Sequence, residues 1–130
     1  DRRSERREAQ QAIVDLRIRT QGPEQAVVHL SGGNQQKVVL AKWLAAHADI
    51  FIFDEPTRGI DVAARHDIYL LMNRRVEQGA GVMMISSDLP EVLGMSDRVL
   101  VMRAGAVATE LAAADATETA VLQAALGIAS

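Results

Sequence analysis

The chain has 130 residues, of which 48% are hydrophobic and 24% charged, and its formal net charge is −3. This composition is that of an ordinary globular protein, and the length allows one domain, or part of one, with a modest core. The acidic balance gives no electrostatic case for nucleic-acid binding, and the absence of cysteine excludes disulfides. No apolar run approaches the roughly 20 residues that a membrane-spanning helix needs.

The N-terminal part of the chain is expected to form two helices joined by a loop. Residues 4–18 have the periodicity of an amphipathic helix, and the basic residues at its start alternate with acids, as on a solvated helix face. A glycine and a proline mark a loop over 20–29. A second helix is expected over 33–46, with Trp43 packed in the core or against a neighbouring subdomain. Its inward-facing side chains are expected to be Val38, Leu40, Ala41, Leu44 and Ala45.

Strands and helices alternate through the middle of the chain. The continuous apolar run 50–53 predicts a strand covered on both faces of a parallel sheet. A helix is expected over 62–78 and a second buried strand over 82–86. A short helix is expected over 89–95, with Pro90 tolerated in its first turn. This alternation favours an α/β layer fold.

The C-terminal part is expected to contain a hairpin and a last helix. Residues 98–102 and 106–110 fit an antiparallel pair that turns at an Ala-Gly dipeptide. Asp115 and Glu118 have the spacing of a capping box before a helix over 120–126. The glycine that follows this helix suits its C-terminal cap.

The most informative stretch is Leu-Ser-Gly-Gly-Asn-Gln-Gln at 30–36, immediately before the second helix. Glycine allows the backbone to approach a ligand closely, and Ser31 offers both a hydroxyl and a helix cap. The unpaired N–H groups and the positive dipole end of the helix favour phosphate oxygens. By itself such a turn also fits an ordinary junction between a loop and a helix.

Two adjacent carboxylates, Asp54 and Glu55, follow the apolar run at 50–53. Ligand sites of open α/β sheets lie at the carboxyl ends of strands. Successive side chains alternate about a strand, so the two acids point in different directions and can do different work. The alternative is an ordinary Asp-Glu-Pro turn that closes the strand.

Taken together, these motifs resemble those of the ATP-binding cassette (ABC) family. Residues 30–36 are similar to its signature motif, 50–55 to its Walker B strand and 58–61 to its D-loop, in the family's order and spacing. The resemblance continues to about Gly105. The segments LSGGNQQKVVLAKWL and DEPTRGIDV are most similar to the second cassette of twin-cassette importers of the ribose, galactose and xylose type. This resemblance implies an α/β, P-loop NTPase-like three-layer fold, present here in part.

The phosphate-binding pattern G-x-x-x-x-G-K-[ST] does not occur in the sequence, whose only lysines, Lys37 and Lys42, lie in the signature helix. In the family this loop precedes the point at which this sequence begins. We therefore expect residues 1–130 to be the C-terminal part of one nucleotide-binding domain. Within it, 1–47 would be the helical subdomain with the signature motif. Residues 48–130 would hold the Walker B, D-loop and switch region with the C-terminal strands and helix.

The resemblance also implies roles for individual residues. Asp54 occupies the position that supports Mg²⁺, usually through water, and Glu55 the position that orients and polarises the attacking water. In the family two cassettes enclose two ATP molecules head to tail, and the signature of one cassette contacts the nucleotide held by the other. The residues expected to bind that nucleotide are Ser31, Gly32, Gly33, Asn34 and Gln35.

The switch position departs from the usual family pattern. Most cassettes have histidine before the aspartate, whereas this sequence has Ser87 before Asp88. A serine donates a hydrogen bond but carries no positive charge near neutral pH. The resemblance thus makes Ser87 a catalytic position in a site that hydrolyses ATP more slowly. The alternative, which can coexist with this role, is that Ser87 caps the helix that begins at Leu89.

Three further kinds of residue are open to two interpretations each. Asp61, in the D-loop position, would reach across the cassette interface toward nucleotide, or cap the helix that begins at residue 62. Arg58 would be an interface residue or an exposed loop arginine. The three histidines lack the spacing of metal ligands, which favours solvated or capping roles, and they are His29, His47 and His66.

The function implied by the resemblance is that of an ATP-binding and ATP-hydrolysing subunit, here a fragment, that energises sugar import with ATP and Mg²⁺. Its partners would be a second cassette, membrane permease subunits and, indirectly, a sugar-binding protein, with no nucleic acid. It would act at the cytoplasmic face of the membrane. The isolated fragment is expected to be inactive and to self-associate. The alternatives are a non-transport ABC-type ATPase and a dimerisation module without hydrolysis.

Overall fold

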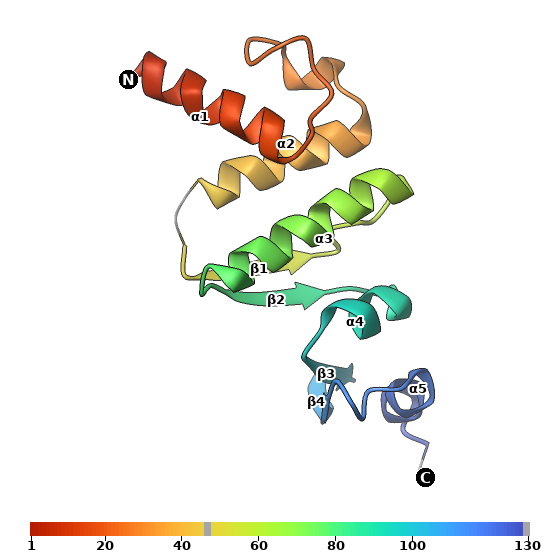
Figure 1. Ribbon diagram of the computed structural model, residues 1–130. Coiled ribbons are helices and arrows are strands. Elements are labelled where there is room, and N and C mark those ends of the chain that lie inside the picture. Colours follow the sequence, from red (N-terminus) through yellow and green to blue (C-terminus); the bar gives the residue numbers. More distant parts are fainter. Residues whose placement is uncertain (46–47, 129–130) are drawn as a thin grey trace. The chain divides into compact units, whose positions relative to one another are not determined.

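The structure is a computed structural model that describes residues 1–45 and 48–128 (Figure 1). The chain divides into two compact units, residues 1–83 and 84–130. The predicted end of the second helix at Ala46, the histidine at 47 and the expected subdomain boundary there lie outside the described residues.

Helix α1 (Arg2–Asp15) opens the first unit. The side chain of Asp1 accepts a hydrogen bond from the backbone N–H of Arg3 at 3.0 Å and so caps the helix. The helix ends earlier than the predicted residue 18, because Arg17 adopts a positive φ of 50° and turns the chain. This turn allows Leu16 and Ile18 to be buried in the core.

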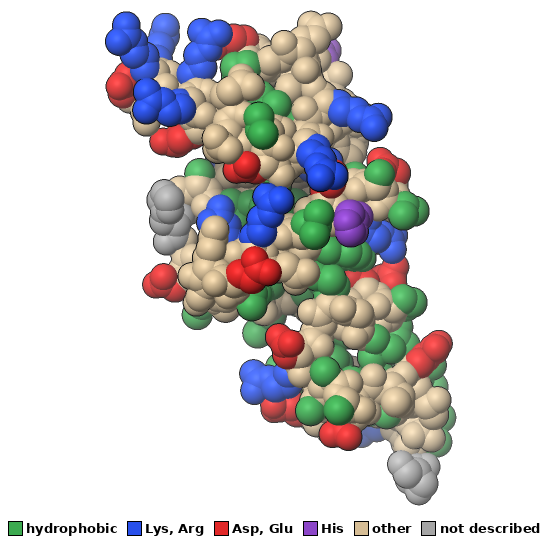
Figure 2. Space-filling view, in the orientation of Figure 1, with side chains coloured by type: hydrophobic (Ala, Val, Ile, Leu, Met, Phe, Trp, Pro, Cys, Tyr) green, Lys and Arg blue, Asp and Glu red, His purple; other side chains and the backbone are tan. Residues whose placement is uncertain are grey.

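The basic start of α1 is solvent-exposed, as predicted. Figure 2 shows basic side chains gathered at the N-terminal end of this helix, with acidic side chains among them. Every side chain from residue 1 to residue 8 is exposed. This run is therefore a solvated helix face.

Helix α2 (Gly32–Leu44) follows a 3₁₀ turn, η1 (Val27–His29), and lies beside α3 (Figure 1). Its buried residues are Lys37, Leu40 and Leu44, which recur at helical spacing on one face. The prediction that Trp43 packs in the core is wrong, because the Trp43 side chain is 64% exposed. Its alternative, contact with a neighbouring subdomain, stays a prediction. Ala45 is likewise exposed.

The first unit also contains β1 (Ile50–Asp54) and α3 (Val62–Glu77), and β2 (Gly81–Ile85) begins within it. The strands β1 and β2 form a two-stranded sheet and point the same way in Figure 1. The predicted alternation of strand and helix is thus confirmed. The buried residues of α3 are Ala64, Ile68, Leu71 and Met72, whereas Val76, predicted to be inward, is exposed.

The prediction that the first strand is covered on both faces is wrong. Phe51 and Phe53 are buried, and the Arg75 guanidinium of α3 lies 5.9 Å from the centre of the Phe51 ring. Ile50 and Ile52 point to the opposite face and are 69% and 65% exposed. Among the described residues, then, only one face of this strand is covered. The β2 strand, which was also expected to be buried, alternates between exposed and half-buried residues.

The second unit begins within β2 and continues with α4 (Leu89–Met95), whose limits match the predicted helix. Strands β3 (Arg98–Arg103) and β4 (Ala106–Ala112) pair antiparallel with an irregularity between Val101 and Met102. The predicted turn is confirmed, and both of its residues, Ala104 and Gly105, have positive φ.

Helix α5 (Glu118–Leu126) packs on this hairpin and ends, as predicted, at Gly127 in the left-handed conformation. The predicted capping box is wrong. The N-cap is Thr117, whose hydroxyl oxygen accepts a hydrogen bond from the Ala120 N–H at 3.1 Å. Asp115 instead belongs to the preceding turn, where its N–H donates to the carbonyl of Ala112.

Throughout the described residues, no helix has the length and apolarity to cross a membrane.

Candidate functional site

The signature segment places Ser31 at the N-cap position of α2, but its hydroxyl does not cap the helix. The Ser31 Oγ instead accepts a hydrogen bond from Asn34 Nδ2 at 2.8 Å, and the Ser31 carbonyl accepts one from the Gln35 N–H at 2.8 Å. The Ser31 side chain is exposed. Its hydroxyl is thus held at the open end of the helix.

Two amide side chains hold this segment in place. Asn34 Oδ1 accepts a hydrogen bond from the backbone N–H of Arg19 at 2.9 Å, which ties the signature to the segment after α1. Gln35 Nε2 donates to the carbonyl of Leu30 at 2.8 Å, across the start of the helix. Both residues predicted to bind nucleotide therefore also have a structural role.

The two signature glycines have different surroundings. A Cβ at Gly32 would meet no atom within 4 Å, so this position is open. A Cβ at Gly33 would lie 3.2 Å from the Ala64 Cβ and 3.4 Å from Asp61 Oδ2. Gly33 is therefore where the signature turn packs against the start of α3, and the structure brings Gly33 and Asp61 together.

Asp61 caps α3, which confirms one of its two interpretations. Its Oδ1 accepts a hydrogen bond from the Ala64 N–H at 2.9 Å. That hydrogen bond is the main cause that lowers the pKa of Asp61 below its usual 3.8. The carboxylate is thus charged at neutral pH, at the positive end of a helix.

The two carboxylates at the end of β1 differ in their backbone conformation. Asp54 is the last residue of the strand and is exposed, whereas Glu55 is half-buried and has a positive φ of 47°. Its carbonyl accepts a hydrogen bond from the Arg58 N–H at 3.2 Å, which closes a turn. A residue other than glycine held in this conformation costs about 1–3 kcal/mol and is often found at a functional site.

The turn after Glu55 is anchored to the signature helix. Pro56 and Thr57 are buried, and Gln36 Nε2 donates to the Pro56 carbonyl at 3.4 Å. The carboxylate pair and the signature are thereby linked within the first unit.

The exposed carboxylate of Asp54 fits the chemistry of a magnesium ion whose other ligands are waters and phosphate oxygens. Mg²⁺ binds one or two carboxylates and keeps waters and phosphate oxygens as its other ligands. Asp54 offers such a carboxylate in an exposed position at the end of the strand. No group of three or more His, Cys, Asp or Glu that would hold a metal by itself occurs in residues 1–45 and 48–128.

Ser87 belongs to the second unit, whereas the other predicted site residues belong to the first. The interpretation of Ser87 as a helix cap is wrong, because the cap of α4 is Asp88, whose Oδ1 accepts from the Glu91 N–H at 3.1 Å. Ser86 Oγ accepts from the Asp88 N–H at 3.0 Å and donates to Glu91 Oε2. This closed set of hydrogen bonds fixes the backbone on both sides of Ser87, whose side chain is exposed.

The residues that sequence reasoning missed form a charged cluster between α2 and α3. Lys37 Nζ lies 2.5 Å from Asp67 Oδ2, and Arg17 Nη1 lies 3.7 Å from Asp67 Oδ1. The sequence carried a signal for this ion pair. Lys37 falls at helical spacing from Leu40 on the apolar face of its helix, and Asp67 is adjacent to the buried Ile68. A charge on an apolar helix face indicates a buried partner.

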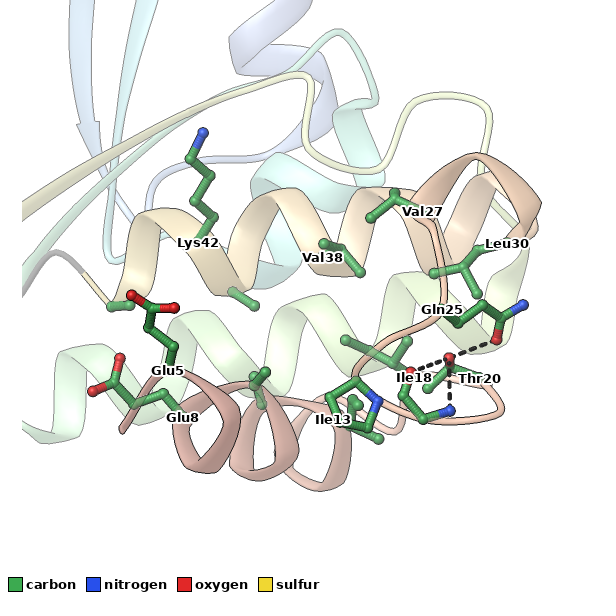
Figure 3. A pocket seen from close by; sticks show the side chains of 16 residues that line it. Glu5, Glu8, Ile13, Ile18, Thr20, Gln25, Val27, Leu30, Val38 and Lys42 are labelled. Atoms are coloured by element: carbon green, nitrogen blue, oxygen red, sulfur yellow. Dashed lines mark hydrogen bonds between the residues drawn. The ribbon is translucent and has the colours of Figure 1, made fainter. Parts of the chain in front are cut away.

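A groove of about 320 Å³ lies between α1 and α2 (Figure 3). Its walls are largely apolar. Figure 3 shows Glu5 and Glu8 at one end, and at the other Thr20, whose hydroxyl donates to Gln25 Oε1 at 2.7 Å. Leu30 lines the groove, but the predicted site residues do not. The groove thus adjoins the signature segment at Leu30 but does not include the residues predicted to bind nucleotide.

His29 and His66 are exposed, as their lack of metal-like spacing suggested, and Arg58 lies exposed in the loop after β1.

Known proteins resemble this chain in family, in sequence and in structure. The model of a family described as ABC transporter matches residues 2–58. A ribose import ATP-binding protein of Rubrobacter xylanophilus is 55% identical over 89% of this chain, which spans 23% of that protein. An arabinose import ATP-binding protein of Pectobacterium atrosepticum is 53% identical over 91% of this chain and 23% of its own length. A xylose import ATP-binding protein of Histophilus somni is 53% identical over 89% of this chain and 23% of its own length.

Solved structures show the same fold. A dimeric ATP-binding cassette in a post-hydrolysis state, bound to ADP and Pi, matches 82% of this chain and 46% of its own with a TM-score of 0.73 and 24% identity. The ADP conformation of another ATP-binding cassette of an ABC transporter matches 90% of this chain and 44% of its own, with a TM-score of 0.71 and 22% identity. The chain thus spans about a quarter of the curated relatives and about half of these cassettes.

Proposed function

The chain belongs to the ABC transporter family, and from this premise we propose that it is part of the ATP-binding and ATP-hydrolysing subunit of a sugar importer. One observation carries the proposal: the signature segment lies against both the D-loop and the carboxylate turn. Gly33 packs against Asp61 at the start of α3, and Gln36 holds the turn that presents Asp54 and Glu55. The import function is supported by relatives whose names describe ribose, arabinose and xylose import.

In the proposed mechanism, the signature acts on an ATP molecule held by a second cassette. The Ser31 hydroxyl and the N–H groups of Gly32 and Gly33 would donate hydrogen bonds to its γ-phosphate, with Asn34 and Gln35 around them. Fixed donors at the positive end of a helix stabilise the negative charge that develops on a transferring phosphoryl group. The open position at Gly32 leaves room for such an approach.

The carboxylates would act at the chain's own nucleotide site. Glu55 would orient the attacking water and accept its proton, while Asp54 would hold Mg²⁺ through water. Bound Mg²⁺ would neutralise charge on the phosphate oxygens. Ser87 would donate a hydrogen bond to the same phosphate, but without the positive charge that histidine supplies in most cassettes. This site is therefore proposed to be the slower one.

The proposed partners follow from this assignment. They are a second cassette, toward which Asp61 would face, membrane permease subunits and, through these, a sugar-binding protein. The subunit would lie at the cytoplasmic face of the membrane. The 130-residue chain by itself is proposed to be inactive, because its sequence has no G-x-x-x-x-G-K-[ST] loop to hold the β- and γ-phosphates.

The test measures ATP turnover by a full-length subunit, as long as the relatives, that contains these 130 residues. We expect Ser31→Ala to lower turnover more than Glu55→Gln, because Ser31 completes the faster site. Glu110→Gln, an exposed carboxylate of β4, is the control and should leave turnover unchanged. Unchanged turnover in both Ser31→Ala and Glu55→Gln would refute the proposal.

A calorimetric titration of the 130-residue chain with MgATP gives a second test. We expect no binding. Tight binding that depends on Mg²⁺ would mean that the nucleotide site lies elsewhere in the chain.

A further inference from the structure

We infer that Asn34 is a positioning residue that fixes the direction in which the Ser31 hydroxyl donates its hydrogen. The inference rests on the proposed contact of Ser31 with a γ-phosphate and adds how that contact is prepared. Asn34 has a hydrogen-bond partner on each side of its amide group, Arg19 N–H on Oδ1 and Ser31 Oγ on Nδ2.

The Arg19 N–H determines the orientation of the Asn34 amide. A backbone N–H only donates, so the atom of Asn34 that lies 2.9 Å from it must be the oxygen. The NH₂ group of the same amide is then the atom that lies 2.8 Å from Ser31 Oγ. The alternative amide orientation would place two donors against each other at Arg19.

The amide orientation in turn determines what the Ser31 hydroxyl does. An NH₂ group only donates, so Ser31 Oγ must accept a hydrogen bond from Asn34 and cannot donate its own hydrogen to that group. That hydrogen remains for an acceptor outside the segment. A phosphate oxygen is such an acceptor, and Ser31 is exposed at the end of the helix where a phosphate binds most favourably.

The group that sets the orientation of the Asn34 amide, the Arg19 N–H, lies outside the signature motif. Arg19 is fifteen residues before Asn34 and directly follows Ile18, which is buried and whose N–H donates to the Ile13 carbonyl at 2.9 Å. The packing of the segment after α1 thus holds the Arg19 N–H in place. A substitution in that segment would therefore change the direction in which the Ser31 hydroxyl donates, although no residue of the signature is substituted.

The test reverses the direction of the hydrogen bond with an isosteric change. In Asn34→Asp the introduced carboxylate still accepts from the Arg19 N–H, but it also accepts from Ser31 and draws the hydroxyl hydrogen toward itself. In a subunit of the relatives' length, we expect turnover to fall about 10- to 100-fold, as for the loss of a hydrogen bond to a charged group. Ser31→Ala should cause a similar loss, with the fall in kcat rather than a rise in KM.

The added charge must be separated from the reversed hydrogen bond. In the double variant Ser31→Ala, Asn34→Asp, only the charge effect remains, so we expect little loss beyond that of Ser31→Ala. The loss in Asn34→Asp should also persist at high salt, which screens repulsion between exposed charges. Hydrogen exchange of the Arg19 amide checks the fold, because Asn34→Asp should keep its protection and Asn34→Ala should lose it.

The outcomes separate the proposed function of Ser31 from the role inferred for Asn34. If Ser31→Ala leaves turnover unchanged, the proposed function of Ser31 is wrong. If Ser31→Ala lowers turnover but Asn34→Asp does not, the role inferred for Asn34 is wrong. An equal loss from Asn34→Asp with and without the Ser31 hydroxyl, or a loss abolished by salt, would also overturn it.

Discussion

Lys37 of α2 and Asp67 of α3 form an ion pair inside the first unit, with Nζ 2.5 Å from Oδ2. Lys37 is 5% exposed, and its Nζ also lies 3.4 Å from the carbonyl oxygen of Arg17, to which it donates. The pair therefore joins the signature helix to α3 and to the turn that ends α1. A charge in such a place is tolerated because it is paired and hydrogen-bonded.

We expect Lys37→Met to lower the free energy of unfolding of the first unit by about 2–3 kcal/mol, because it leaves the half-buried Asp67 carboxylate with Arg17, 3.7 Å away, as its remaining ionic partner. Removing both partners, in Lys37→Met, Asp67→Leu, should cost less than the sum of the two single changes. Urea denaturation measures both. Lys42→Met is the matched control, since Lys42 is an exposed lysine on the same helix and should change stability by less than about 0.5 kcal/mol.

The Asp61 cap predicts that the stability of α3 falls in acid. Because folding lowers the pKa of Asp61, the stabilisation is complete above the usual value of 3.8 and is lost as the pH falls through the lowered pKa. Asn is an equally good cap without a charge, so Asp61→Asn should remove this part of the pH dependence. An NMR titration of the Ala64 amide follows the change, and an identical acid response in both proteins would contradict the assignment.

The signature glycines are expected to respond differently to alanine. Gly33→Ala should give a free energy of unfolding about 1 kcal/mol lower than that of Gly32→Ala, because both changes gain helix propensity but only the Cβ at position 33 would crowd Ala64 and Asp61. Gly32→Ala has open space and should stay within about 0.5 kcal/mol of the parent protein. Gly32→Ala should still lower ATP turnover if that position faces a nucleotide, which separates folding from function. Equal destabilisation by the two changes would refute this account.

The β3–β4 turn carries an avoidable strain at Ala104. Its φ is 49° and that of Gly105 is 81°, the pair of positive values that a type I′ hairpin turn requires and that Asn-Gly satisfies best. Ala104→Asn should raise the free energy of unfolding of the second unit by about 0.5–1 kcal/mol. Gly105→Ala, which meets open space but imposes the same strain, should lower it. Thermal unfolding of the two variants compares them directly.

The exposed face of β1 predicts self-association of the 130-residue chain. Ile50 and Ile52 present neighbouring apolar side chains on the one face of β1 that is uncovered among the described residues, and such a surface favours association. Ile52→Lys should reduce the association seen by light scattering. Val14→Lys, which replaces an apolar residue 62% exposed on α1, should not. A monodisperse monomer in the parent chain would contradict the prediction.

Local chemistry was sufficient to predict several elements. The short helix 89–95 and the hairpin turn were recognised because a proline in a first turn and an Ala-Gly pair between apolar strands act within a few residues. The family was recognised in the same way, from motifs of contiguous residues. Such signals do not depend on what the rest of the chain does.

Burial and hydrogen-bond direction were decided by neighbours distant in the sequence. The pattern of α2 did not show that Trp43 faces solvent or that Lys37 has Asp67 of another helix as its partner. Residue type did not distinguish Asp88 from Ser87, or Thr117 from Asp115, because all four are types that cap helices. The place where each segment turns into its helix decided between them.

The sequence by itself thus determined the order of the elements, the signature and carboxylate motifs and the family to which they belong, because these follow from short-range propensity and spacing. The tertiary structure alone decided that Gly33 meets Asp61, and that the Arg19 N–H orients Asn34 toward Ser31. Contacts of this kind join residues fifteen or more positions apart, and their energies arise only when packing has brought the partners within reach.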